Sequence, residues 1–194
     1  MDIIKVFYDL ETTGVDVRKH SIHQIAGLIE VNNEVVEKFN IFSRPHPKAL
    51  IDEGALKACR KTQEELLSYP DMEHAHKEFK AILGKYIDPF DTKQKAWAVG
   101  FNNRYFDDVF LRAWFKQNGD EFIGSWFWVD TLDTLVLASQ YLIHRRAAMP
   151  SFKQHRVARE LGIVVDEDRL HDASYDVELT RGIYRIVTGL DIEL

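Results

Sequence analysis

The apolar positions near the start of the chain are spaced as in buried β-strands. Residues 3–8 are apolar or aromatic apart from Lys5, which is typical of a central strand covered on both faces. Two further apolar segments, 24–31 and 34–42, flank Asn32-Asn33, a pair that favours a tight turn. The pattern therefore predicts three strands in an antiparallel meander.

Further along the chain, the apolar spacing changes to the three-and-four repeat of helices. Helices are predicted over 55–67, 72–86, 104–117, 131–141, 150–161 and 172–187. The first could also be a helical turn followed by a separate helix, because Thr62 and Glu65 form a capping-box pattern. Short apolar runs at 96–100 and 126–130 predict two more strands. We therefore expect one α/β domain over 1–194, with a mixed sheet and flanking helices.

Composition places the chain among ordinary globular proteins. Hydrophobic residues make up 45% and charged residues 29% of its 194 residues. No apolar run approaches the length of a membrane span, and no signal-like segment opens the chain, so no membrane partner is expected. The single Cys59 excludes an intramolecular disulfide and favours a reducing, cytoplasmic location. We expect Cys59 to be a small packed or surface residue rather than a nucleophile.

The charge distribution leaves two interpretations open. A net charge of −6 is a poor overall match for nucleic acid. Residues 144–159 nevertheless contain no acid, and their basic side chains and histidines are His144, Arg145, Arg146, Lys153, His155, Arg156 and Arg159. This stripe could bind a phosphate backbone, or it could be a solvated helix face. His74 and His76 are two residues apart on a predicted helix, so they are expected at the surface rather than as a metal pair.

Two acids follow the first predicted strand and suggest a metal site. Asp9 and Glu11 are two residues apart, and side chains on a strand repeat every two residues, so both carboxylates point the same way. Like charges at the end of a buried strand repel each other, and a hard divalent cation such as Mg²⁺ or Mn²⁺ would remove that penalty. A solvated turn is the alternative, and Gly14 would allow the backbone to turn there.

Two later segments offer matching acids. Asp107 and Asp108 lie in the first turn of the predicted helix 104–117; helix-dipole pairing would explain one of them, not both. His171 and Asp176 are five residues apart, about 140° on a helix, so they do not share a face. Asp176 could point to a metal while His171, in the preceding loop, accepts a proton from water. A lone loop histidine is the alternative.

Taken together, these residues fit phosphodiester cleavage with two metal ions. Four carboxylates, those of Asp9, Glu11, Asp176 and either Asp107 or Asp108, would hold two cations about 3.5–4 Å apart. One ion would generate hydroxide and the other would stabilise the leaving oxygen, with His171 as the general base.

The motifs resemble those of the DEDDh family of 3′-to-5′ exonucleases, which are DnaQ-like. The first motif, Asp-x-Glu-Thr-Thr-Gly, is matched at 9–14, and the third, His-x-Ala-x-x-Asp, at 171–176. The second, Gly-Phe-Asn-Asn-Arg-Tyr-Phe-Asp-Asp at 100–108, is most similar to that of bacterial exonuclease I and places the metal acid at Asp107, with Asp108 as the fallback. Asp130-Thr131-Leu132 also looks like the family's strand-to-helix Asp-Thr-Leu.

This resemblance implies a fold and an activity. The fold is ribonuclease H-like, with a mixed five-stranded sheet of an antiparallel meander plus parallel strands, flanked by helices. The implied enzyme uses two Mg²⁺ or Mn²⁺ ions and releases nucleoside 5′-monophosphates from a single-stranded 3′ end. The likeness to exonuclease I favours DNA over RNA. An RNA 3′-trimming enzyme and a non-catalytic nucleic-acid or polymerase-associated module are the alternatives.

The resemblance also implies substrate contacts. Leu10, Thr12 and Thr13 would pack against or hydrogen-bond the terminal nucleotide, and Asn102 would order the site. Two positions depart from the family pattern: Phe101 replaces a histidine, and Arg60 replaces a glycine in a turn that often touches the 3′ nucleotide. Since the likeness is to the nuclease domain of exonuclease I without its accessory domains, we expect a distributive or weakly processive enzyme.

Overall fold

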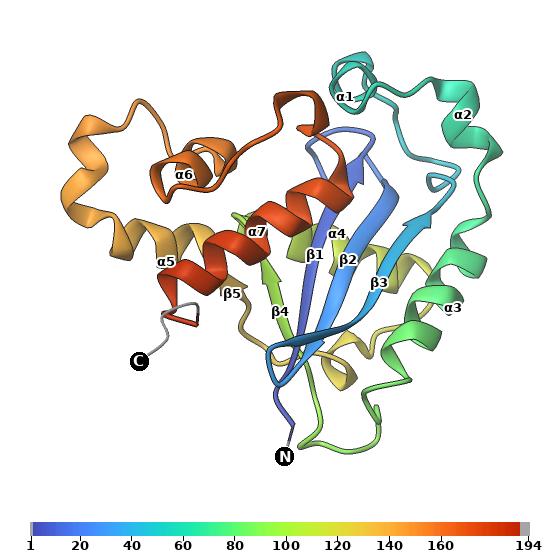
Figure 1. Cartoon of the computed structure of the whole chain (residues 1–194). Helices are drawn as coiled ribbons and strands as arrows, with labels where there is room; N and C mark the ends of the chain where they lie inside the picture. The colour runs from blue at the N-terminus through green and yellow to red at the C-terminus, as the bar shows by residue number, and fades with distance from the viewer. Residues whose placement is uncertain (1, 191–194) are drawn as a thin grey trace.

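A five-stranded mixed sheet forms the centre of the protein (Figure 1). The computed structural model describes residues 2–190. The strands are β1 (Ile4–Thr12), β2 (Ile22–Val31), β3 (Glu34–Phe42), β4 (Trp97–Gly100) and β5 (Leu132–Asp133), in the order β3-β2-β1-β4-β5. The β1–β2 and β2–β3 pairs are antiparallel, whereas β1–β4 and β4–β5 are parallel. The predicted mixed sheet, with β1 at its centre, is confirmed.

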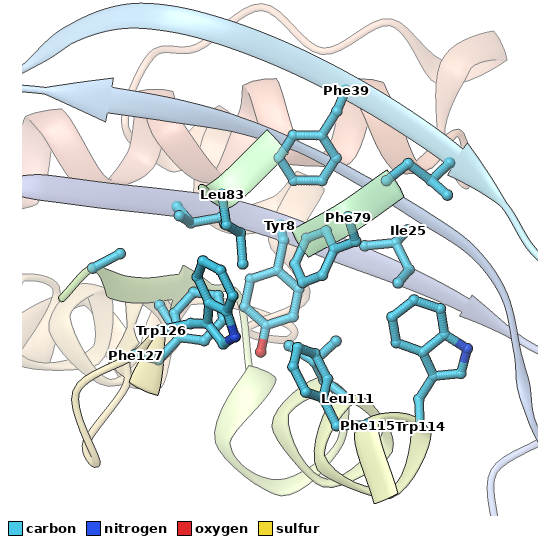
Figure 2. Packing of buried hydrophobic residues seen from close by; sticks show 14 of the residues in the cluster. Tyr8, Ile25, Phe39, Phe79, Leu83, Leu111, Trp114, Phe115, Trp126 and Phe127 are labelled. Atoms are coloured by element: carbon cyan, nitrogen blue, oxygen red, sulfur yellow. The ribbon is translucent and has the colours of Figure 1, made fainter. Parts of the chain in front are cut away.

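Helices cover both faces of this sheet (Figure 1). They are α1 (Glu53–Cys59), α2 (Gln63–Ser68), α3 (Met72–Leu83), α4 (Asp107–Gln117), α5 (Thr134–Tyr141), α6 (Gln154–Glu160) and α7 (Ala173–Val187). Helices α3 and α4 enclose one face around a largely aromatic core that includes Phe79, Trp114 and Phe115 (Figure 2). Helix α7 packs on β1 and β2 across the other face, with α5 and α6 against it.

The alternation along β1 decides which side chains face which layer. Tyr8 and Leu10 belong to the core under α3 and α4. Phe7 points the other way and meets Tyr184 of α7 edge to face, with ring centroids 5.4 Å apart. Because strand side chains repeat every two residues, Asp9 and Glu11 lie on the same face as Phe7, towards α7.

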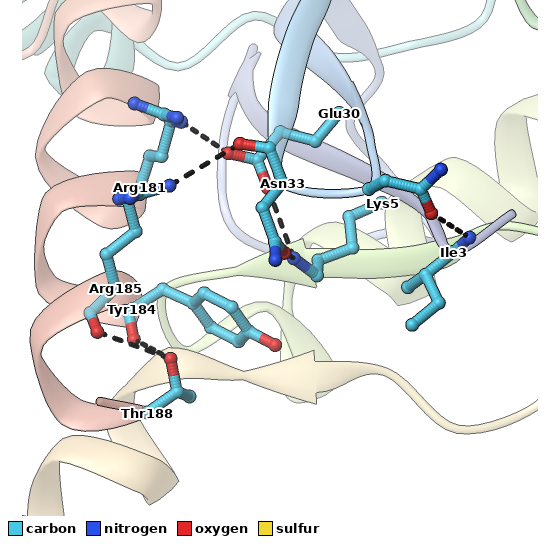
Figure 3. A network of polar contacts seen from close by, with 9 residues as sticks. Ile3, Lys5, Glu30, Asn33, Arg181, Tyr184, Arg185 and Thr188 are labelled. Atoms are coloured by element: carbon cyan, nitrogen blue, oxygen red, sulfur yellow. Dashed lines mark hydrogen bonds and ion pairs between the residues drawn. The ribbon is translucent and has the colours of Figure 1, made fainter. Parts of the chain in front are cut away.

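A buried ionic network fixes α7 against the sheet (Figure 3). Glu30 of β2 is fully buried, and its carboxylate receives Lys5 Nζ at 3.2 Å and Arg181 Nε at 2.6 Å. Asn33 Oδ1 accepts a second hydrogen bond from Lys5 Nζ, at 2.5 Å. Since a buried charge is tolerated only when paired, these contacts specify one placement of α7 along β1 and β2.

The fifth strand differs from the prediction. The predicted strand 126–130 forms only one parallel bridge, between Phe127 and Ala96, and the chain then bends at residues 129–130. The apolar side chains of Trp126 and Phe127 pack in the core, which explains the apolar run at this position without a longer strand. The strand and helix that follow are β5 and α5, so the strand-to-helix Asp-Thr-Leu is the second copy, 133–135, rather than 130–132.

The helix bounds also shift. The predicted helix 55–67 is two helices, because Arg60 adopts a left-handed conformation with φ 57° and ends α1. Thr62 then caps α2 by accepting a hydrogen bond from the Glu65 backbone N–H at 3.2 Å, as the capping pattern predicted. The helix predicted over 150–161 begins only at Gln154, since 150–153 are irregular.

Two side-chain expectations have opposite outcomes. His74 is exposed, but His76 is 3% exposed and lies between Trp114 and Phe115, so the prediction of a surface His76 is wrong. It occupies the inner face of α3, where burial lowers its pKa to about 4.

Cys59 is half-buried, and burial raises the pKa of its thiol, which disfavours a nucleophilic role. Over residues 2–190, no helix has the length and apolarity to cross a bilayer.

Candidate active site

Asp9 and Glu11 lie at the carboxyl end of β1, half-buried and facing α7. Burial raises the pKa of Asp9 well above its usual value, and repulsion from Asp107, Glu11 and Asp176 raises it further. Burial and the charges of Asp176 and Asp172 raise the pKa of Glu11 to about 7. Carboxylates from two other elements, α4 and α7, are therefore close enough to repel the two strand acids.

Asp107 occupies the first turn of α4 and is 6% exposed. Its Oδ1 accepts a hydrogen bond from the Leu10 backbone N–H at 3.2 Å, which ties α4 to the end of β1. Burial raises its pKa to about 8, opposed by hydrogen bonds from the Asp107 and Leu10 backbone, with repulsion from Asp108 and Glu11 adding to the rise.

Asp108 has different partners. It accepts a hydrogen bond from the hydroxyl of Tyr8, and the positive charge of Arg112 acts on it. Asp107 instead accepts a hydrogen bond from the Leu10 backbone, and the charge of Glu11 contributes to its raised pKa, so it lies on the side of the strand acids. Of the two neighbouring carboxylates, the geometry thus favours Asp107 as the member of the acid cluster.

Asp176 enters from the first turn of α7. Burial raises its pKa to about 6, against the lowering effects of the charge and backbone hydrogen bond of His171. The side-chain amide of Gln154, from α6, donates to the Asp176 carbonyl oxygen at 2.6 Å and to Thr180 Oγ1 at 2.8 Å. Asp172 caps the helix by accepting from the Tyr175 N–H at 3.0 Å. These contacts hold the α7 end that carries Asp176.

His171 lies in the loop before α7, as the sequence predicts, with an exposed side chain and a left-handed φ of 68°. It lines a pocket of about 320 Å³ between β3, the α1–α2 turn and its own loop. Arg60 lines the same pocket and donates to the Asp168 carbonyl oxygen at 3.4 Å. The imidazole is therefore accessible to solvent and to a ligand while staying beside Asp176.

The four acids have the chemistry of a divalent-cation site. Hard carboxylate oxygens suit Mg²⁺ or Mn²⁺, and the mutual repulsion of Asp9, Glu11, Asp107 and Asp176 is what such cations would relieve. Within residues 2–190, no three acidic, histidine or cysteine side chains already have the arrangement of a metal site. The residues present fit a divalent cation by the type of their oxygen ligands and by the repulsion that Asp9 and Glu11 feel from the neighbouring acids.

The predicted substrate residues lie near this cluster with their hydrogen bonds internal to the chain. Leu10 packs in the core, and Thr12 Oγ1 donates to the Gly14 carbonyl oxygen at 2.8 Å. Thr13 is fully buried and donates to the Leu50 carbonyl oxygen at 2.7 Å. Asn102 is exposed, with φ 61°, and its backbone N–H donates to Asp133 Oδ1 at 2.9 Å. Their contacts with a nucleotide stay predictions.

Asn103 is an ordering residue that the sequence did not single out. It is fully buried, and its amide donates to Thr131 Oγ1 at 2.6 Å and to Asp108 Oδ1 at 3.4 Å. Thr131 in turn donates to the Ala98 carbonyl oxygen at 2.9 Å. The adjacent asparagines of the second motif give no signal as to which one turns inward, because that depends on the left-handed backbone at Asn102.

The raised carboxyl pKa values predict a pH-dependent stability without divalent cations. The folded protein still holds protons on Glu11 and Asp107, with pKa values of about 7 and about 8, where the unfolded chain has released them. The folded state then binds more protons than the unfolded state, so the free energy of unfolding falls as pH rises from about 6.5 to about 8.5. Burial lowers the pKa values of His23 and His76 from about 6.5 to about 4, so these histidines make the free energy of unfolding rise with pH mainly between about pH 4 and about 6.5, below this range.

Urea unfolding in EDTA across this pH range measures the effect. Saturating Mg²⁺ should flatten the decline, because a bound cation replaces the protons as the counter-charge. A free energy of unfolding that stays constant or rises with pH in EDTA would contradict the acid cluster.

Comparison with known families agrees with the motifs. Residues 6–184 match the model of the RNase_T family, described as an exonuclease. The chain belongs to the RNase_T exonuclease family. The predicted relationship to the DnaQ-like exonucleases is thereby confirmed, since the match covers the elements from β1 to α7 that carry all three motifs.

The curated relatives of this family member are much longer proteins. It is 27% identical over 182 residues to the DNA polymerase III PolC-type of Mycoplasmopsis pulmonis (strain UAB CTIP), and 27% identical over 188 residues to that of Staphylococcus aureus (strain bovine RF122 / ET3-1). The alignments cover 92% and 94% of this chain but 11% of each relative.

Solved structures of E. coli exonuclease I share the fold of this RNase_T member. Its zinc-bound complex with single-stranded DNA has a TM-score of 0.77 at 19% identity, covering 98% of this chain and 41% of that chain. Its complex with a dA16 oligonucleotide has a TM-score of 0.77 at 20% identity, covering 97% and 41%. At such identities the likeness shows the fold alone, and it confirms the predicted ribonuclease H-like architecture.

Proposed function

We propose that this protein is a metal-dependent 3′-to-5′ exonuclease that releases nucleoside 5′-monophosphates from single-stranded DNA. The observation that carries the proposal is the meeting of carboxylates from β1, α4 and α7, whose charges raise one another's pKa values. Family membership supports the reaction class. The substrate choice rests on the exonuclease I structures, which are in complex with single-stranded oligonucleotides.

The proposed mechanism assigns a task to each residue. Asp9, Glu11, Asp107 and Asp176 would hold two Mg²⁺ or Mn²⁺ ions. These ions would lower the pKa of a bound water and neutralise charge on the leaving oxygen. His171 is exposed beside Asp176, so its imidazole can take the proton of the attacking water and pass it to solvent. The backbone hydrogen bond from Leu10 orients the Asp107 carboxylate for this work.

Degradation of matched oligomers tests both the activity and the choice of sugar. We expect Mg²⁺-dependent shortening of a 5′-labelled DNA dodecamer from its 3′ end, faster than that of the same RNA sequence. No contact to a 2′-hydroxyl can be assigned from the chain, and RNA selection would require one. Faster shortening of the RNA would replace the DNA proposal with an RNA-trimming enzyme.

EDTA and the Asp176→Ala variant are the matched controls, and both should abolish shortening because each removes part of the cation site. A wild-type protein that is inert on DNA and RNA 3′ ends with Mg²⁺ and with Mn²⁺ would contradict the proposal. It would favour a non-catalytic module that binds nucleic acid or a polymerase.

A further inference from the structure

The basic stripe of residues 144–159 is divided by the structure into paired and unpaired charges. Arg145 forms an ion pair with Glu160 at 2.5 Å, and Arg159 pairs with Glu167. Across residues 2–190, no carboxylate lies within ion-pair distance of Lys153 or Arg156, and both side chains are exposed. The stripe therefore retains positive charge that the fold does not neutralise, in a chain whose net charge is −6.

These charges are anchored next to the acid cluster. Helix α6 packs on α7 (Figure 1). The side-chain amide of Gln154 donates to the carbonyl oxygen of Asp176 at 2.6 Å. Lys153 and Arg156 flank Gln154 in sequence and remain exposed while it faces inward. His155 lies between them in the sequence. Burial lowers the pKa of His155, and the nearby positive charges of its basic neighbours and of His171 lower that pKa further. The unpaired charges thus adjoin the base.

Arg146 adds a planar group to this surface. Its guanidinium lies over the Phe152 ring, 4.6 Å from the ring centroid, and its side chain is exposed. One face of the guanidinium is covered by Phe152, which leaves the other for a second planar group. Nucleobases stack on arginine planes of this kind. We name the surface formed by Arg146, Lys153, His155 and Arg156 the α6 basic face.

We propose that the α6 basic face binds the single strand on the 5′ side of the scissile bond, with Lys153 and Arg156 on phosphates and Arg146 stacked on a base. The inference rests on the proposed function, because the 3′ end must lie at the acid cluster for the strand to leave over α6. Exposed arginines and lysines that make no ion pair can neutralise phosphates, and each neutralised phosphate releases counterions that are condensed on the strand.

Substrate length separates this role from an effect on the site itself. For Lys153→Gln/Arg156→Gln we expect the KM for dT12 in 50 mM NaCl to rise about tenfold, with kcat unchanged. The KM for the dinucleotide dT2 should stay within about twofold, since its single phosphate is the scissile one and it has no phosphate on the 5′ side for Lys153 and Arg156 to bind. Lys93→Gln/Lys116→Gln removes the same charge from exposed positions elsewhere and should leave both KM values unchanged.

Anisotropy of 5′-fluorescein-labelled dT12 in EDTA measures binding without hydrolysis. The salt slope of log Kd should lose about 1.4 in the Lys153→Gln/Arg156→Gln variant, two contacts at about 0.7 each. Arg146→Lys keeps the charge but not the plane, and should weaken dA12 binding about fivefold.

An unchanged dT12 affinity and salt slope in the double variant would overturn the inference, as would an equal rise in KM for dT2. A wild-type protein that binds dT12 but degrades nothing would overturn the proposed function while the anisotropy comparison still decides the role of the α6 basic face.

Discussion

Replacing Asp107 with asparagine should abolish hydrolysis and stabilise the protein. We expect kcat to fall about 10³- to 10⁵-fold, because the change removes one of the carboxylates that would hold the cations. The asparagine oxygen can still accept the hydrogen bond from Leu10, so the start of α4 keeps its attachment to β1. In EDTA at pH 8, loss of a buried charge among other acids should raise the free energy of unfolding by about 1–3 kcal/mol.

Asp108→Asn is the matched control, since it makes the same change one residue along the chain. Its carboxylate is engaged by Tyr8 and attracted by Arg112, so we expect kcat to stay within about tenfold of wild type. Single-turnover hydrolysis of labelled DNA and urea unfolding in EDTA measure the two effects. A larger loss of kcat in Asp108→Asn than in Asp107→Asn would exchange the roles of these two acids.

Replacing His171 with asparagine should lower kcat about 10²- to 10⁴-fold while leaving Mn²⁺ binding intact. The imidazole would act on water rather than on the cations, so its loss removes proton transfer and not the metal ligands. Asparagine is a better choice than alanine because His171 has φ 68°, and asparagine tolerates this left-handed conformation. The loop geometry is thereby kept while the base is removed.

Isothermal titration with Mn²⁺ and single-turnover kinetics measure the two consequences. His74→Asn, at an exposed position on α3, is the control and should match wild type in both assays. Loss of Mn²⁺ binding in His171→Asn would make the histidine a ligand instead of a base. A kcat within about threefold of wild type would remove it from the mechanism.

The sequence located the acids because the required signals are local. Asp9 and Glu11 end an apolar run, and the two-residue period of a strand places both on one side, which β1 confirms. The position of Asp176 on a helix and that of His171 in the preceding loop also followed from local pattern. By contrast, the choice between Asp107 and Asp108 depends on which one meets Leu10 and which meets Tyr8, partners about 100 residues away.

The predictions from sequence were wrong where the position of a side chain depends on contacts with residues far away in the chain. Trp126 and Phe127 look like a strand but fill the core, and His76 looks like a surface residue but packs between Trp114 and Phe115. The Asp-Thr-Leu at 130–132 is duplicated at 133–135, and only the start of α5 shows that Asp133 is the capping copy. Composition and local periodicity give no information about these contacts, because the contacting residues are far apart in the sequence.

By itself, the sequence determined the mixed sheet, the family motifs and the side of its own element to which each acid points, because backbone periodicity sets these within a few residues. The tertiary structure alone decided that β1, α4 and α7 bring those acids together. That meeting depends on the buried Lys5–Glu30–Arg181 network, the Leu10–Asp107 hydrogen bond and the Gln154–Asp176 contact, which join residues far apart in the chain. Their physical basis is that a buried polar group requires a partner, wherever in the sequence that partner lies.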